Sequence, residues 1–325
     1  MTESECHTLN CGVPQGSVIG APAFTFYTAP LSDILSAHHI NHMIYADDIQ
    51  IYIDFKPSEQ LSALQRLESC IADIKSWATQ NKLKFNDNKT EIIHITSRFR
   101  TCRPLPPIKI GDTLVKPISK SRNLGVIFDE HLQLKDQVSK IIRSGWSGIH
   151  KIGHLRKYLD QTLSEKLVHA FITSHLDYCN ALLAGLPDKE ILRLQRLQNA
   201  SARIVTRAKR RDHISPVLYN LHWLPVRLRI HFKLLLIMYK CSIGHAPDYL
   251  SELIVPYAPA RTLRSASLNL VVQPKAVSKS YGERSFSYIG PTLWNALPNW
   301  IKTSPSIDSF KRNLKSFLFK QHYQS

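Results

Sequence analysis

Two short apolar runs flank a pair of acidic residues near the start of the chain, and apolar residues then recur every three or four positions over much of the rest. The runs fall at residues 43–46 and 49–53, are rich in residues typical of strands, and predict two β-strands joined by a tight turn. A helix is expected to open at Pro57-Ser58. Its apolar face would consist of Leu61, Leu64, Leu67, Ile71, Ile74 and Trp77. We expect this face to pack against the sheet that the strands form.

Short apolar runs bounded by Pro, Gly and Ser predict further strands, at residues 91–96, 108–110, 114–115 and 124–128. From about residue 132 the apolar spacing becomes helical over long segments. The expected helices are 132–151, 162–183, 188–208 and 225–242, with a last one at 307–319. The pattern therefore predicts an α+β fold, in which an antiparallel sheet with a packed helix is followed by an α-helical region.

The charge of the chain divides at nearly the same place as this pattern. Residues 1–130 contain 13 Lys and Arg against 14 Asp and Glu, whereas residues 131–325 contain 29 against 11. The formal net charge of +17 therefore arises after residue 130. Such a basic excess is typical of proteins that bind nucleic-acid phosphates, although a solvated basic surface gives the same count.

Two adjacent carboxylates, Asp47 and Asp48, fall at the turn between the first two predicted strands. Like charges this close repel each other unless a cation neutralises them, and carboxylate oxygens suit Mg²⁺ or Mn²⁺. Two such ions can activate an attacking hydroxyl and stabilise the leaving pyrophosphate in phosphoryl transfer. Asp is also common in turns without metal, so the pair alone leaves a solvated turn open.

Four segments follow one another along the first part of the chain: Gly12-Val13-Pro14-Gln15-Gly16-Ser17, Tyr45-Ala46-Asp47-Asp48, Phe85 to Glu91 and Asn123 to Asp129. In order and spacing they resemble the motifs of reverse transcriptases from non-LTR (LINE-type) retrotransposons, most closely the jockey-like and chicken-repeat-like branches. A C-terminal segment around Gly290-Pro291-Thr292-Leu293-Trp294 extends the resemblance. The chain is thus identified as resembling the C-terminal portion of such a polymerase.

The resemblance implies RNA-templated DNA synthesis on a DNA primer, with dNTP substrates and Mg²⁺ or Mn²⁺ as cofactor. The implied catalytic residues are the metal ligands Asp47 and Asp48, and Lys89 near the triphosphate. Contacts to nucleotide and template would come from Gly12, Pro14, Gln15, Gly16, Ser17, Tyr45 and Ala46. The primer grip would consist of Leu124, Gly125 and Val126.

The resemblance also implies three regions: a partial palm at 1–130, a helical thumb-like region at 131–245 and a basic, aromatic C-terminal region at 246–325. The family carries a third metal-binding aspartate upstream of the Gly12 segment, where this sequence offers only Glu3 and Glu5. Without that ligand the two ions are not held at the separation that catalysis needs. We therefore expect the isolated chain to be inactive alone. The alternative is a non-enzymatic nucleic-acid-binding remnant of a decayed element.

The third long predicted helix carries arginines beside its apolar stripe and leads into a basic cluster. The candidate contacts to a nucleic-acid backbone are Arg193, Arg196, Arg203, Arg207, Lys209, Arg210 and Arg211. A solvated helix face also explains the arginines, and the last three residues also fit a nuclear-localisation signal. Aromatic residues beside cations after Pro247 fit either base stacking or the core of a small domain.

Metal and membrane signals are weak. The 6 cysteines and 15 histidines form no Cys-x-x-Cys or His-Glu-x-x-His arrangement, so neither a zinc site nor a disulfide framework is expected. No apolar run reaches the roughly 18 residues that cross a bilayer, and the first residues do not resemble a signal peptide. We expect an intracellular protein of the nucleus and cytoplasm, with nucleic-acid partners and no membrane association.

Overall fold

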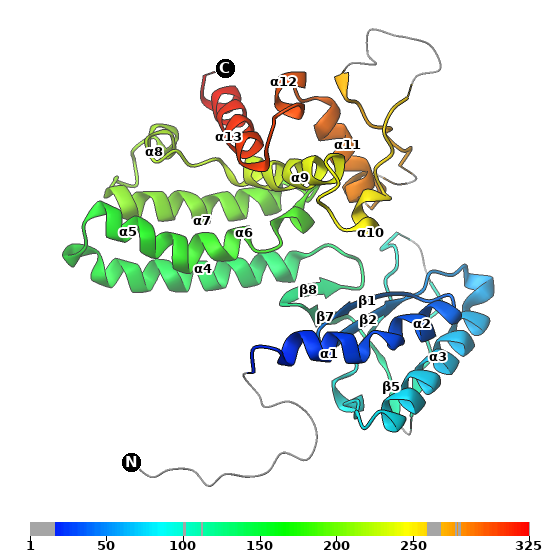
Figure 1. Cartoon of the computed structure of the whole chain (residues 1–325). Helices are drawn as coiled ribbons and strands as arrows, with labels where there is room; N and C mark the ends of the chain where they lie inside the picture. Colours follow the sequence, from blue (N-terminus) through cyan, green and yellow to red (C-terminus); the bar gives the residue numbers. More distant parts are fainter. Residues whose placement is uncertain are drawn as a thin grey trace. The chain divides into compact units, whose positions relative to one another are not determined.

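The computed structural model of the chain describes residues 17–99, 102–111, 113–258, 268–276, 278 and 281–324. Contacts between residues divide the chain into two compact units, Met1–Ser121 and Arg122–Ser325 (Figure 1). The boundary between these units lies before the one that the sequence predicts after residue 130. The second boundary that the sequence predicts, after residue 245, falls within the second unit.

The first unit consists of three helices and several short strands. Its helices are α1 (Gly20–Thr28), α2 (Pro30–Ala37) and α3 (Gln60–Gln80), the last preceded by the 3₁₀ turn η1 (Pro57–Glu59). Strands β1 (Asn41–Tyr45) and β2 (Asp48–Tyr52) form an antiparallel hairpin in which Tyr45 pairs with Asp48. The hairpin and the long amphipathic helix that the sequence predicts are therefore both present.

The remaining strands are short and do not join one sheet in the described residues. Those predicted at 108–110 and 114–115 are present, whereas the one predicted at 91–96 is reduced to Ile92–Ile93. The strands are β3 (Ile92–Ile93), β4 (Ile108–Ile110), β5 (Thr113–Val115), β6 (Pro117–Ile118), β7 (Lys120–Asn123) and β8 (Val126–Asp129). They pair as β3–β6, which is parallel, β4–β5, which is antiparallel, and β7–β8. Prolines at 104, 106, 107 and 117 remove donors that a longer ladder would need.

The core of the first unit lies between the β1–β2 hairpin, α2 and α3. Its buried residues are Leu31, Leu35, Ile40, Cys70 and Ile74, against which Ile44, Ile49, Ile51 and Leu67 pack. Leu61 does not join it, although the sequence placed it on the apolar face, because 71% of its surface is exposed in the first turn of α3. Ala63 and Ala78 are buried on this helix instead.

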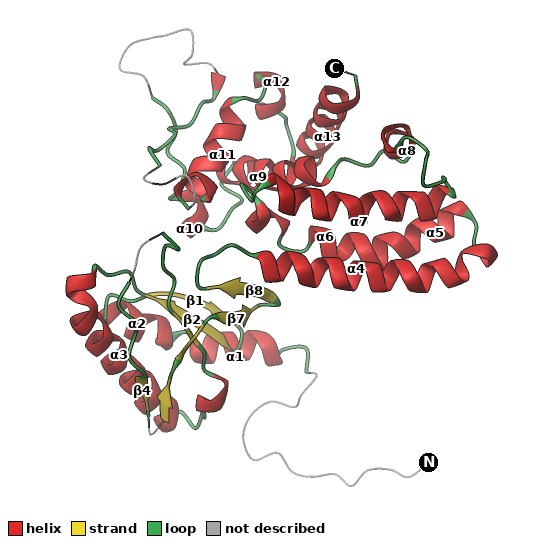
Figure 2. Cartoon of the chain, turned by 180° about the vertical axis from the view of Figure 1, so that it is seen from behind, coloured by secondary structure: helices red, strands yellow, loops and turns green. Residues whose placement is uncertain are grey.

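After strand β8, the described part of the second unit is mainly helical (Figure 2). Its first helices are α4 (Lys135–Leu155), α5 (Gln161–Val168), α6 (Ser174–Asp177), α7 (Asp188–Thr206), α8 (Ile214–Asn220) and α9 (Val226–Ser242). A π-helical segment, η4 (His169–Thr173), joins α5 to α6, and a 3₁₀ turn, η5 (Asn180–Leu183), follows them. The later helices are α10 (Asp248–Ser251), α11 (Phe286–Asn295), α12 (Asn299–Lys302) and α13 (Ile307–Tyr323), with a long loop segment between α10 and α11.

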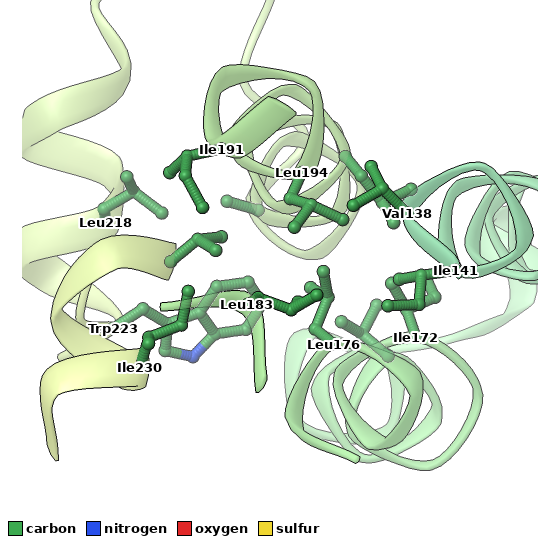
Figure 3. Packing of buried hydrophobic residues seen from close by; sticks show 14 of the residues in the cluster. Val138, Ile141, Ile172, Leu176, Leu183, Ile191, Leu194, Leu218, Trp223 and Ile230 are labelled. Atoms are coloured by element: carbon green, nitrogen blue, oxygen red, sulfur yellow. The ribbon is translucent and has the colours of Figure 1, made fainter. Parts of the chain in front are cut away.

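The larger core of this unit lies among α4, α7, α9 and the α5–α6 run, whose apolar side chains point toward one another (Figure 3). Helix α7 buries Ile191, Leu194, Leu197 and Val205, four of the five residues that the sequence assigned to its stripe. The fifth, Ile204, is partly buried against the same cluster. The helical periodicity therefore identified the buried face of α7 correctly.

A second core joins α9 to the C-terminal helices. The Tyr239 ring stacks on Phe310 with centroids 4.1 Å apart, and its hydroxyl donates to the Ser304 carbonyl oxygen over 2.6 Å. Trp294 is buried in this cluster, and its indole N–H donates to Asn269. Because α9 contributes Ile230 to the first core and Tyr239 to the second, the C-terminal helices pack as part of the second unit.

No helix in the described part of the chain is both long and apolar enough to span a membrane. The four cysteines within it, Cys70, Cys102, Cys179 and Cys241, are free thiols. Burial raises the pKa of the Cys70 thiol, and the nearby Asp73 carboxylate raises it further.

Candidate active site

The two predicted metal ligands lie at the tip of the β1–β2 hairpin. Ala46 and Asp47 form its two-residue turn, and Asp48 opens β2 opposite Tyr45. Ala46 has a φ of 53°, in the left-handed region that an alanine occupies only at a cost. Both carboxylates are exposed to solvent, so the turn presents two adjacent negative charges at the surface of the unit.

The two faces of the hairpin explain why the tip is held in place. One face carries Ile44, Ile49 and Ile51, which pack on the core of the first unit. His42 adds a hydrogen bond between its Nε2 and the Ser32 hydroxyl over 2.8 Å. The opposite face carries exposed side chains: Met43, Tyr45, Asp48, Gln50 and Tyr52. Asp48 and Tyr45 therefore share an open face beside the turn.

The donor chemistry of the tip fits a hard divalent cation. Mg²⁺ commonly keeps several waters and is held by one or two carboxylates together with substrate phosphates, which an exposed Asp47–Asp48 pair permits. No group of three His, Cys, Asp or Glu side chains suited to a metal occurs among the described residues. The hairpin therefore offers two protein ligands, and the other coordination positions are open to water and phosphate.

Lys89 lies on a separate loop of the first unit, at the end of the 3₁₀ turn η2 (Asp87–Lys89). Its side chain is exposed, whereas the neighbouring Asp87 carboxylate is part-buried and forms an ion pair with Lys75 Nζ at 2.5 Å. Gly111 makes room for this pair, since a Cβ at that position would lie 2.1 Å from Lys75 Nζ. The ion pair fixes the loop and leaves Lys89 free to reach a ligand.

The predicted primer grip forms the turn between β7 and β8. Leu124 and Gly125 have φ values of 43° and 83°, and the following Val126 is buried. The sequence placed Leu124 and Gly125 inside a strand, and the structure corrects this because a left-handed φ cannot continue a β-ladder.

Helices of the second unit hold this turn through two side chains that the sequence did not single out. The Tyr178 hydroxyl donates to the Leu124 carbonyl oxygen over 2.6 Å, and Lys140 Nζ donates to the Gly125 carbonyl oxygen. Burial lowers the pKa of Lys140, and the nearby Arg122 lowers it further. These contacts span more than a dozen residues of sequence, so no local pattern could reveal them.

Strand β8 also prepares the start of α4. The Asp129 carboxylate accepts hydrogen bonds from the backbone N–H groups of His131, Gln133 and Leu134, at 3.1, 2.9 and 2.6 Å. The Ile127 N–H donates to Gln137 over 3.0 Å. The last predicted motif thus ends in a carboxylate that orders the turn leading into the first long helix of the second unit.

The candidate backbone-binding arginines separate into two groups. Arg193 bonds Glu190 at 2.6 Å and Ser139 at 3.1 Å, and Arg203 donates to the carbonyl oxygens of Lys209 and Asp212. These two side chains are engaged within the fold. The exposed members of the set are Arg196, Arg207, Lys209, Arg210 and Arg211.

The segment Gly12, Pro14, Gln15 and Gly16 lies outside the described residues. Ser17 is the first residue that the structure describes, and it leads through a turn into α1. Its predicted contact with nucleotide or template stays a prediction.

Comparison with known proteins bears on this site directly. Residues 2–128 match the family "Reverse transcriptase (RNA-dependent DNA polymerase)". This range contains the Asp47–Asp48 hairpin, Lys89 and the Leu124–Val126 turn. The first part of the chain is therefore similar in sequence to reverse transcriptases.

Three polymerases of mobile elements are similar to this chain. The RNA-directed DNA polymerase from mobile element jockey of Drosophila funebris is 26% identical over 45% of this chain and 16% of its own length. The probable RNA-directed DNA polymerases from transposons X-element and BS of Drosophila melanogaster are 23% and 24% identical over 62% and 61% of this chain. Each of the latter is covered over 22% of its own length. The chain thus spans about a fifth of the relatives that it matches, and no solved structure is significantly similar to it.

Proposed function

We propose that this chain provides the metal-binding hairpin, the primer-grip turn and the thumb-like helices of an RNA-directed DNA polymerase of a non-LTR retrotransposon. One observation carries the proposal. The adjacent carboxylates Asp47 and Asp48 stand exposed at the tip of a core-anchored hairpin, within the range that matches the reverse-transcriptase family.

Each residue of the site has a role in this reaction. Asp47 and Asp48 would hold Mg²⁺ or Mn²⁺ against the phosphates of an incoming dNTP. When bound, the metal would supply Lewis-acid stabilisation of the pentacovalent phosphate and of the leaving pyrophosphate. Lys89 would place a positive charge, and a proton for the pyrophosphate oxygen, beside the triphosphate. The Leu124–Val126 turn would position the primer end.

Two carboxylates alone do not complete a two-ion site. Since the described residues hold no third acidic or histidine ligand beside the pair, we infer that synthesis needs a further carboxylate, and that the chain alone binds metal without sustaining turnover. The exposed cations after Arg207 favour nucleic-acid binding in either case.

The test is Mn²⁺ binding, measured by electron paramagnetic resonance in the presence of dTTP and an annealed RNA template with a DNA primer. We expect Asp47→Asn and Asp48→Asn each to weaken binding at least roughly 10-fold, because each removes one charged oxygen ligand. Asp54→Asn is the matched control, since Asp54 is also exposed and follows the same hairpin. Equal Mn²⁺ affinity in all three variants would contradict the proposed metal site and leave only the nucleic-acid-binding alternative.

A further inference from the structure

Two basic segments that lie far apart in the sequence meet at one end of the helical bundle, where α4 and α7 both end (Figure 1). Arg156, just after α4, donates to the last carbonyl oxygens of α7, from Nε to Ile204 over 2.7 Å and from Nη2 to Val205 over 2.8 Å. Arg207 returns a bond to the Arg156 carbonyl oxygen over 3.3 Å. These contacts fix the two segments beside each other.

We call residues 151–160 and 203–212 together the basic end. They contain 8 Lys and Arg against 2 Asp. Both acids serve as local caps. Asp160 accepts from the Leu163 N–H over 2.6 Å, and Asp212 accepts from the Lys209 N–H over 2.6 Å. The surface therefore keeps a formal excess of 6 positive charges, from 8 cations less 2 acids.

The cations of the basic end are presented on an ordered backbone. Arg203 donates to the carbonyl oxygens of Lys209 and Asp212 over 3.2 and 2.8 Å, which closes the turn after α7. The exposed cations around it are Lys157, Arg207, Lys209, Arg210 and Arg211. No described Asp or Glu forms an ion pair with any of these five side chains. Their charges are therefore available to phosphates without first breaking an ion pair.

An aromatic ring stands among these charges. Tyr158 follows α4 and keeps 76% of its surface exposed, and Lys157 Nζ lies 4.7 Å from its ring centroid. Apolar packing does not explain an exposed ring of this size on a basic surface. An exposed aromatic flanked by cations is the combination by which proteins hold single-stranded nucleic acid, since the ring stacks on a base and the cations bind the phosphates. A duplex offers no such base, because its bases already stack on each other.

We propose that the basic end binds single-stranded RNA or DNA, with Tyr158 stacked on one unpaired base and Lys157, Arg207 and Lys209–Arg211 on the adjoining phosphates. This site is built wholly from residues after 150 and needs no metal. It extends the proposed function, because it adds a contact to an unpaired strand, and it does not depend on nucleotide transfer.

The experiment is fluorescence anisotropy of the full chain with a labelled 12-nucleotide oligo(U), and with a 12-base-pair duplex as the comparison, over a series of salt concentrations in EDTA. We expect the single strand to bind more tightly than the duplex. Tyr158→Ala should weaken its binding roughly 10-fold, whereas Tyr158→Phe, which keeps the ring, should bind like the wild type. Loss of Lys209, Arg210 and Arg211 to Ala should reduce the slope of log K against log salt by about 2.

The control variant replaces Arg312, Lys315 and Lys320 on α13, which are equally exposed and carry the same charge, by Ala. It should leave the slope nearly unchanged. The proposal is overturned if Tyr158→Ala binds like the wild type, if the duplex binds as tightly as the single strand, or if the control lowers the slope as much. Asp47→Asn should not alter this binding, so failure here and failure of the metal site are separable outcomes.

Discussion

At the scale of single residues, the backbone conformation of Ala46 in the carboxylate-bearing turn lowers the free energy of unfolding. Its φ of 53° lies in the left-handed region, which glycine adopts readily and a residue with a Cβ does not. We expect Ala46→Gly to raise the free energy of unfolding by about 1 kcal/mol, because left-handed backbone disfavours an L-residue by roughly that amount. Urea unfolding of the full chain measures the change.

The matched control is Ala72→Gly, at an exposed position inside α3. Since the backbone there is helical, glycine should lower the free energy of unfolding by about 1 kcal/mol. The two substitutions are chemically identical and opposite in expected sign. If Ala46→Gly also destabilises, the turn does not have the left-handed conformation described here.

His231 gives the second unit a dependence on pH. Burial within α9, and then the nearby Arg227, lower the pKa of this imidazole from 6.5 to about 4. The unfolded chain therefore binds a proton on His231 between about pH 6.5 and pH 4 that the folded chain does not bind. Stability from this group is present above pH 6.5 and is lost as the pH falls through this window.

We expect the free energy of unfolding to fall by on the order of 2 kcal/mol through His231 between pH 7 and pH 4. Denaturant unfolding at a series of pH values measures this slope. In His231→Gln the contribution should disappear and the remaining slope should be shallower. An unchanged slope in the variant would show that His231 is not protonated on unfolding.

At the scale of elements, the turn between β7 and β8 depends on a helix for its position. The Tyr178 hydroxyl reaches the Leu124 carbonyl oxygen, and its ring lies where a Cβ on Gly125 would contact it at 3.6 Å. We expect Tyr178→Phe to lower stability by about 1 kcal/mol and to speed amide hydrogen exchange in β7 and β8. Hydrogen-exchange mass spectrometry reads out the peptide that contains the turn.

Tyr158→Phe is the control for the loss of a tyrosine hydroxyl, because most of the Tyr158 side chain is exposed. It should change neither the stability nor the exchange of the turn. If Tyr178→Phe likewise leaves exchange in β7 and β8 unchanged, the hydroxyl does not brace the turn.

The elements that the sequence predicted well are those whose pattern is local. Helix α7 begins and ends within two residues of the expected 188–208, because its apolar stripe follows the helical period without interruption. The helix expected at 162–183 instead ends at Asp177, and Cys179 has a left-handed φ of 51° that no periodicity reveals. Helix α8 was not predicted, since seven residues are too few for a clear period.

The residues of the candidate site likewise divide into those that the sequence pattern located and those whose contacts it could not reveal. The Asp47–Asp48 turn followed from the apolar, β-rich runs on both sides of it, and the β1–β2 hairpin confirms that placement. The roles of Arg193 and Arg203 could not be seen in the sequence, because their partners depend on how the chain folds back on itself. The contacts of Arg156 with α7, which create the basic end, arise for the same reason.

At the scale of the whole molecule, the boundary between the two units predicts which residues the helices of the second unit need in order to fold. Both cores of the second unit consist of residues after 121, so we expect residues 122–325 to fold alone with a cooperative unfolding transition. A fragment cut at the boundary that the sequence suggests, 131–325, would lack Asp129 and Ile127. It would then leave the N–H groups of Gln133 and Leu134, just before α4, without their carboxylate acceptor, and Gln137 without its backbone donor.

Loss of the carboxylate that accepts these N–H bonds costs roughly 1 kcal/mol, and loss of the bond to the buried Gln137 adds a similar amount. The fragment 131–325 should therefore unfold with a free energy lower by about 2 kcal/mol than that of 122–325. Asp129→Asn in the longer fragment isolates the effect of the carboxylate and should account for part of the difference. Equal stability of the two fragments would place the boundary at residue 130 and would show that β8 is dispensable to the helices. A stability that falls only when β8 is removed would instead assign the segment from Asn123 to Asp129 to the folding unit that carries the basic end.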